Sequence, residues 1–167
     1  MKCPDRMRRL FLLEVEDNMK VWTLREPWAS MVVLGEKKWE TRSRPNRKIV
    51  GQTVGIHASA HHFKDFLDSD GCFIEPFLTR FAMHDVDPDM LRLGCIIGTV
   101  DVETCQPVEE VAPALDYVQY SLGDWSTGRY CFRLAHPRMI EPVEAKGALC
   151  LWEWDAKDLH YNGYPNP

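Results

Sequence analysis

The sequence predicts an α+β fold, a small and partly closed mixed β-barrel of about six strands whose ends are covered by short helices. Short stretches rich in β-branched and aromatic residues, several alternating between apolar and polar positions, recur along the whole chain. Helix-like stretches are few and short, and most fall in the first half. The sequence shows neither βα units repeating at a regular length nor a glycine-rich phosphate loop, which argues against a doubly wound sheet.

The expected elements follow from local patterns. Strands are expected at residues 20–24, 38–44, 53–58, 95–105, 129–134 and 148–154, and helices at 28–34 and 59–67. Pro27 fits the first turn of the earlier helix, and Gly35 can take the left-handed geometry that ends it. Ser59 is a suitable N-cap for the later helix. Residues 68–93 are the least regular and predict two short helices joined by loops.

The length of the chain predicts a single domain. With 167 residues the chain can bury a core without disulfide bonds. We place the domain at residues 19–155, between an N-terminal extension at 1–18 and a C-terminal tail at 156–167. The extension resembles a signal peptide only superficially, because its apolar run is short and acidic residues follow. No apolar run approaches the roughly 18 residues of a membrane helix, so no membrane partner is expected.

Charge is distributed unevenly along the chain. The net charge is −5, but residues 20–64 carry nine Lys or Arg against three Glu, a net charge of +6. Residues 65–167 carry a net charge of −11. This asymmetry predicts a basic patch that attracts an anionic partner, unless the two halves neutralise each other across the fold. An adaptor that binds proteins through the acidic half is a further alternative.

Cysteine and histidine spacing points to neither a metal nor a cofactor. The six cysteines include no C-x-x-C pair, which disfavours a zinc ribbon or a thioredoxin-like site. Cys131 and Cys150 fall in apolar, strand-like runs, where a thiol behaves as a small core residue. This usage favours a reducing, cytoplasmic setting. His57 and His61 are four residues apart, but an expected strand-to-helix junction separates them.

The stretch from Leu34 to Arg44 packs charges of both signs after a glycine turn. In a strand, Glu40 and Arg42 share one face, because successive side chains point to opposite sides. Lys37 lies at the turn and can reach that polar face. Such a cluster suits an anionic or polar ligand, although an ordinary solvated strand face is the simpler alternative.

Several blocks of the sequence, in this order, resemble the ASCH domain (activating signal cointegrator homology). The blocks are residues 24–29, 35–42, 55–59, 128–130 and 146–149, followed by Trp152. At their centre is a G-x-K-x-x-E-x-R pattern, met by Gly35, Lys37, Glu40 and Arg42. The resemblance implies a PUA-like β-barrel with a cleft, and a role in binding RNA or modified nucleotides.

One branch of small ASCH proteins is similar to amidohydrolases that deacetylate N(4)-acetylcytidine. In that branch the lysine matches Lys37, but a threonine takes the place that Glu40 holds here. The chain thus departs from the hydrolytic pattern at the expected nucleophile, and binding is favoured over catalysis. If the chain is an enzyme, Lys37 and Glu40 are the expected acid/base pair of an amidohydrolase or a ribonuclease-like activity.

The candidate ligand-binding residues combine donors, cations and aromatic faces. They are Arg25, Trp28, Lys37, Glu40, Arg42, His57, Ser59, Trp125, Arg129 and Lys146. Trp28 and Trp125 are candidate stacking surfaces for bases, with core packing as the alternative for each. Arg129 is a candidate phosphate clamp, or else the partner of an acidic neighbour. The cleft is expected between Lys37, Glu40, Arg42, His57 and Trp125.

Overall fold

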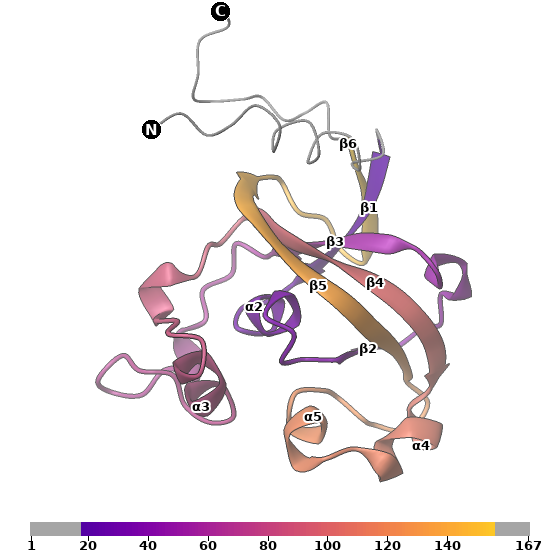
Figure 1. The fold of residues 1–167 in the computed structure, drawn as a ribbon, viewed down its shortest axis with the longest axis horizontal. Helices are drawn as coiled ribbons and strands as arrows, with labels where there is room; N and C mark the ends of the chain where they lie inside the picture. The colour runs from indigo at the N-terminus through magenta and orange to yellow at the C-terminus, as the bar shows by residue number, and fades with distance from the viewer. Residues whose placement is uncertain (1–17, 156–167) are drawn as a thin grey trace, which may run out of the picture.

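The computed structural model describes residues 18–155, so nearly all of the expected N-terminal extension and the tail at 156–167 lie outside the described residues. Its core is one mixed sheet of six strands in the order β2-β5-β4-β3-β1-β6 (Figure 1). The strands are β1 (Asn18–Leu24), β2 (Trp39–Arg42), β3 (Thr53–Ala58), β4 (Cys95–Pro107), β5 (Tyr130–Glu144) and β6 (Leu151–Asp155). β1 and β3 are parallel, and the other neighbours are antiparallel.

Short helices connect these strands. They are α2 (Trp28–Val33), α3 (Phe77–Ala82), α4 (Val108–Val111) and α5 (Tyr117–Ser121), with 3-10 turns η1 (Arg47–Ile49), η2 (Lys64–Phe66), η3 (Pro88–Met90) and η4 (Ala112–Ala114). α2 is apolar on nearly every side and lies inside the curve of the sheet, against β3, β4 and β5 (Figure 1). No helix within residues 18–155 is long and apolar enough to cross a membrane.

The packing of α2 requires a glycine on β4. A Cβ at Gly98 would lie 2.5 Å from Val33 Cγ1 and 2.4 Å from the carbonyl oxygen of Arg138, which is closer than carbon atoms tolerate. The ladder between β4 and β5 shifts register beside Gly98, as is common where a glycine interrupts a strand.

The sheet curves strongly but remains open. Within residues 18–155 its edge strands, β2 and β6, share no ladder, so closure into a barrel is not confirmed. Arg42 of β2 nevertheless reaches β1, donating from Nη2 to the carbonyl oxygen of Thr23 at 3.4 Å. Its guanidinium carbon also lies 5.6 Å from the centre of the Trp22 ring. Side chains thus bridge the gap that a backbone ladder would fill in a closed barrel.

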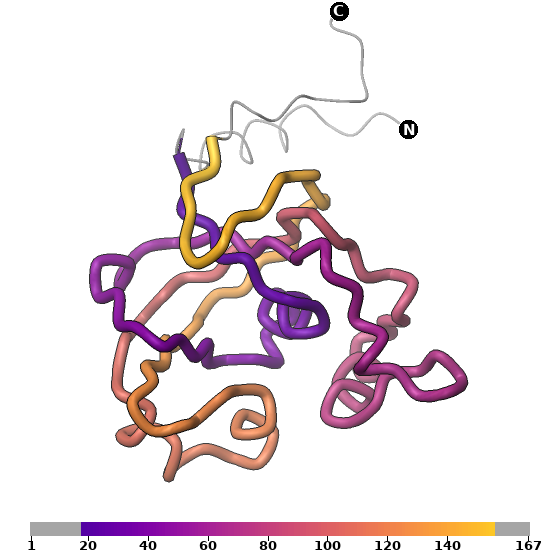
Figure 2. The backbone as a smooth tube through the Cα atoms, turned by 180° about the vertical axis from the view of Figure 1, so that it is seen from behind, coloured from indigo at the N-terminus to yellow at the C-terminus, as the bar shows by residue number. Residues whose placement is uncertain are grey.

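Two inserted segments hang from the end of the molecule that lies away from β6. Residues 59–94 carry α3, and residues 108–129 carry α4 and α5, as the tube in Figure 2 shows. Phe73 and Phe81 of the first segment pack together in a cluster that also contains Met31 of α2 and Leu122 of the second segment. Of the two short helices expected between 68 and 93, one is the α-helix α3, and the other position holds only the 3-10 turn η3.

Three local expectations were wrong. Residues 59–67 form no α-helix beyond the turn η2, so Ser59 has no helix to cap. Its N–H donates to the carbonyl oxygen of Leu24 at 2.8 Å, and its buried hydroxyl has no hydrogen-bond partner within residues 18–155. The last strand begins at Leu151 rather than at 148. Cys150 is exposed with a φ of 64° and is not a core residue, whereas Cys131 is fully buried as expected.

Candidate functional site

A cleft of 410 Å³ opens where β1, β2 and α5 approach one another. Five of the predicted site residues line it, namely Arg25, Trp28, Lys37, Glu40 and Arg42. Residues 121–124, which begin with the last residue of α5, also line the cleft and are called the rim below. The sequence analysis did not identify the rim as part of the site.

A chain of charges forms the floor of the cleft. Lys37 Nζ lies 3.1 Å from Glu40 Oε2, and Arg42 Nε lies 2.8 Å from Glu40 Oε1. The side chains of Lys37 and Glu40 are only 3% and 9% exposed, whereas that of Arg42 is 27% exposed. Lys37 also donates to the carbonyl oxygen of Trp39. One carboxylate between two cations leaves an excess positive charge, so the floor suits an anion.

Trp28 both packs and lines the cleft. Its ring meets Phe66 and Phe77 edge to face, at centroid distances of 4.8 and 5.4 Å. The ring is half-buried, and its remaining surface lies in the cleft wall. Packing against two aromatic rings fixes the orientation of the indole, as a stacking surface requires.

Gln119 holds the backbone on both sides of Lys37. Its Oε1 accepts from the N–H of Lys38 at 2.8 Å, and its Nε2 donates to the carbonyl oxygen of Glu36 at 2.7 Å. Gln119 is itself 9% exposed, and its N–H donates to the carboxylate of Asp116 at 2.8 Å. Because the oxygen and the nitrogen of its side-chain amide are both bonded, Gln119 determines where the turn bearing Lys37 lies against α5. The sequence offers no signal for a contact between residues so far apart.

Thr41 ties β2 to the rim and to the residues that follow it. Its Oγ1 accepts from the N–H of Asp124 at 3.2 Å, and its carbonyl oxygen accepts from Arg129 Nη2 at 3.3 Å. Arg129 also lies beside the Asp124 carboxylate, with 3.3 Å between Nε and Oδ2. Arg129 therefore supports the wall of the cleft and does not line it.

The other predicted site residues lie outside the cleft. They are His57, Ser59, Trp125 and Lys146. Ser59 is buried, Lys146 is exposed, and Trp125 is half-buried beside Tyr120. The structure therefore brings together one half of the predicted set, from the segment between Arg25 and Arg42.

His57 is an interior residue. It is 2% exposed, its Nε2 lies 3.0 Å from the carbonyl oxygen of Ala145, and its ring meets Trp152 edge to face. A Cβ at Gly147 would lie 2.3 Å from the imidazole, so only glycine fits beside it. Burial lowers the pKa of His57 below its usual value, which favours the neutral ring. Within residues 18–155 no group of three His, Cys, Asp or Glu is arranged to hold a metal ion.

Glu26 is a fully buried carboxyl group that the sequence analysis did not single out. Its Oε2 accepts from the N–H of Ser30 at 3.0 Å and its Oε1 from the Ser30 hydroxyl at 2.8 Å. These bonds satisfy a free donor in the first turn of α2, although no side chain bonds from the N-cap position itself. Burial raises the pKa of Glu26 to about 7, against the lowering effect of the Ser30 hydrogen bonds.

The comparisons with known proteins agree with this description of the chain. The family model described as the ASCH domain matches residues 23–144, which include every residue that lines the cleft. No curated protein matches. Among solved structures, the crystal structure of ASCH from Zymomonas mobilis has 17% identity and a TM-score of 0.48, covering 90% of this chain and 85% of that chain. A mutant of the same protein has 18% identity and a TM-score of 0.45, with coverages of 75% and 73%.

The raised pKa of Glu26 predicts a specific dependence of stability on pH. The carboxyl group is protonated in the folded chain up to pH 7, whereas in the unfolded chain it ionises near its ordinary value of 4.5. The wild type therefore loses up to about 3 kcal/mol of unfolding free energy as the pH rises through this window. Glu26→Gln lacks this loss. Urea unfolding of both proteins from pH 4.5 to 8 measures the difference, and parallel curves would contradict the assignment.

Removing the side-chain amide of Gln119 should loosen the turn around Lys37. Gln119→Leu leaves the N–H of Lys38 and the carbonyl of Glu36 without partners, at a cost of about 1–3 kcal/mol. In Gln119→Leu, an acylating reagent should modify the Lys37 amine faster, relative to the exposed Lys38 amine, than in the wild type. Mass spectrometry measures both rates. Gln52→Leu is the matched control, because the side-chain amide of Gln52 donates to the carbonyl oxygen of Lys48 on an exposed turn, away from Lys37. Equal labelling ratios in both variants would exclude a positioning role for Gln119.

Proposed function

The chain belongs to the ASCH domain family, and on that premise we propose that its cleft binds RNA or a modified nucleotide through the G-x-K-x-x-E-x-R motif. The observation that supports this most is the convergence of Lys37, Glu40 and Arg42 in the floor of one cleft, which Trp28 also lines. A positive floor next to an aromatic face is the combination that a nucleotide requires.

Each of these residues has a distinct role in the proposed site. Arg42 presents a partly exposed fork of donors, which suits a phosphate group or a base edge. Arg25, exposed at the mouth of the cleft, adds a second cation. Both oxygens of Glu40 contact a cation, so its main role is to hold Lys37 and Arg42 in place. The cleft volume of 410 Å³ suits one nucleotide. A cytoplasmic setting remains a prediction.

Hydrolysis of a modified nucleoside or of an RNA strand is the second candidate function. One observation favours it, namely that the buried ammonium group of Lys37 and the carboxylate of Glu40 lie 3.1 Å apart at the wall of an open cleft. Such a pair can exchange a proton with a bound substrate. This pair and the family resemblance suggest two reactions. One is the deacetylation of N(4)-acetylcytidine by an amidohydrolase, and the other is ribonuclease-like cleavage of an RNA strand.

Binding through the cleft should depend on Arg42 and not on its neighbour Arg44. Arg42→Ala should weaken binding of a short single-stranded RNA about tenfold and lower the salt dependence by about one phosphate contact, because one cation is lost. Arg44→Ala is the matched control, since Arg44 is exposed on the same segment and does not line the cleft. Fluorescence anisotropy at several salt concentrations measures both effects. Equal affinities for the two variants, with unchanged melting temperatures, would sink the site assignment.

If the chain is an enzyme, its turnover should require the Lys37 amine. Incubation with N(4)-acetylcytidine, and separately with short RNAs, should then yield cytidine or shortened strands that chromatography resolves. Lys37→Ala should lower the rate by a factor of about 100 or more, as expected when a general acid or base is lost. The absence of any turnover above this variant would leave binding as the function of the cleft.

A further inference from the structure

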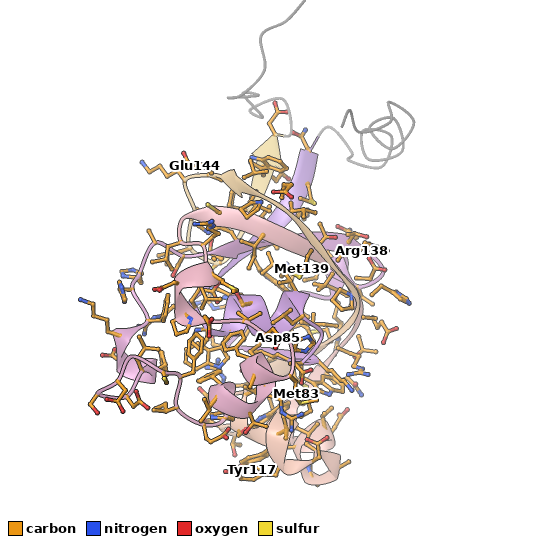
Figure 3. The ribbon with its side chains drawn as sticks, turned by 60° about the vertical axis from the view of Figure 1, so that its left-hand side comes forward. Met83, Asp85, Tyr117, Arg138, Met139 and Glu144 are labelled. Atoms are coloured by element: carbon orange, nitrogen blue, oxygen red, sulfur yellow. The ribbon has the colours of Figure 1, made fainter. Side chains whose placement is uncertain are left out.

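Two exposed tyrosines and a half-buried tryptophan, called the ledge below, flank the rim of the cleft in the sequence. The ledge consists of Tyr117 and Tyr120, three residues apart on α5, and Trp125 in the loop that follows. Tyr117 is 84% exposed and Tyr120 is 53% exposed, both high for aromatic residues. Figure 3 shows Tyr117 projecting outward from the lower end of the molecule. The side chains are therefore available to a ligand that reaches this end.

The ledge is ordered before any ligand arrives. The rings of Tyr120 and Trp125 lie nearly parallel, with 6.3 Å between their centres and 17° between their planes. The indole Nε1 donates to the carbonyl oxygen of Tyr120 at 2.9 Å, which fixes the ring. Gly123 provides the necessary space, because a Cβ there would lie 2.8 Å from Trp125 Nε1. A ligand that stacks here does not have to order these two rings itself.

The ledge is continuous with the cleft. The rim at residues 121–124 lies between Tyr120 and Trp125 in the sequence and lines the cleft. The segment that lines the cleft is therefore bounded by two aromatic residues whose rings lie 6.3 Å apart. A ligand longer than one nucleotide has to leave the cleft over a rim, and this rim places aromatic rings immediately beyond it.

The charges around the ledge favour the faces of bases over phosphate groups. α5 carries no Lys or Arg. The nearby carboxylates already have partners: Asp116 accepts from the N–H of Gln119, Asp124 pairs with Arg129, and Glu109 accepts from the N–H of Gly128. Within residues 18–155, neither α5 nor the rim holds a Lys or Arg, so a ligand meets flat rings with polar edges there, a surface that suits a planar, aromatic group.

We propose that the ledge stacks the unpaired bases of a single strand whose neighbouring nucleotide occupies the cleft. The proposal rests on the proposed function and narrows it, because the ligand becomes a single-stranded segment of nucleic acid rather than a free nucleotide or a duplex. Phosphate recognition belongs to Arg42 and Lys37, whereas the ledge contributes stacking that releases no counterions. The two parts of the surface therefore differ in their response to salt.

The test compares cytidine monophosphate with a short oligocytidylate, using the full chain and four variants, one of which is Arg42→Ala. The wild type should bind the oligocytidylate about tenfold more tightly than the monophosphate, as one or more stacked bases imply. Tyr117→Ala should remove most of this advantage, without changing the salt dependence or the affinity for the monophosphate. Tyr117→Phe should retain it, because the ring remains. Met139→Ala is the control, since Met139 is 62% exposed on β5, away from the ledge (Figure 3).

The outcomes separate the ledge from the cleft. An oligocytidylate affinity that is unchanged in Tyr117→Ala would overturn the proposal that the ledge stacks bases. In that case, loss of monophosphate binding in Arg42→Ala would still support nucleotide binding in the cleft. A wild type that binds neither ligand would overturn both proposals. Because Tyr117 is almost fully exposed, its substitution leaves the packing of the core unchanged, and a melting curve verifies this.

Discussion

The shared carboxylate of Glu40 is the interaction on which the cleft depends. It contacts the cations of Lys37 and Arg42, and its own burial is tolerable only because both are present. Arg42 in turn reaches Thr23 and Trp22 on β1. One carboxylate therefore neutralises a buried lysine and anchors the side chain that spans the opening of the curved sheet. A substitution that removes the Glu40 carboxylate leaves the buried Lys37 and the partly exposed Arg42 close together with no anion between them.

The second constraint is the attachment of residues 108–129 to β2. Gln119 bonds to the backbone on either side of Lys37, and the segment around Asp124 bonds to Thr41. The floor of the cleft is a strand of the sheet, whereas its rim is irregular chain fixed to that strand by hydrogen bonds. This division is common in binding proteins, in which a rigid scaffold positions loops that contact the ligand.

The sequence predicted the parts of the fold and site that depend on local pattern. The alternation of apolar and polar residues located β1, β3 and β4. The spacing of Lys37, Glu40 and Arg42 predicted that they share one face, because the geometry of one turn and one strand sets their relative positions. The PUA-like sheet agrees with the family match, although barrel closure does not follow from it.

The remaining expectations depended on distant contacts, which a local pattern does not contain. His57 was expected at the cleft because it ends a strand, but the chain at Ala145 and Gly147 covers it. The burial of Glu26 and the reach of Gln119 likewise depend on how separate segments meet. Ser59 has the residue type of an N-cap, but residues 59–67 form no α-helix for it to cap.

The pairing of β2 also bears on the order in which the protein acquires its structure. Among the described strands β2 has a single ladder partner, β5, which lies about ninety residues further along the chain. During synthesis the motif emerges early, but it has no strand to pair with until the chain has been made as far as β5. The cleft is therefore among the last features to form. For most of the elongation of the chain, the cations of the motif are present without the folded strand that later holds them.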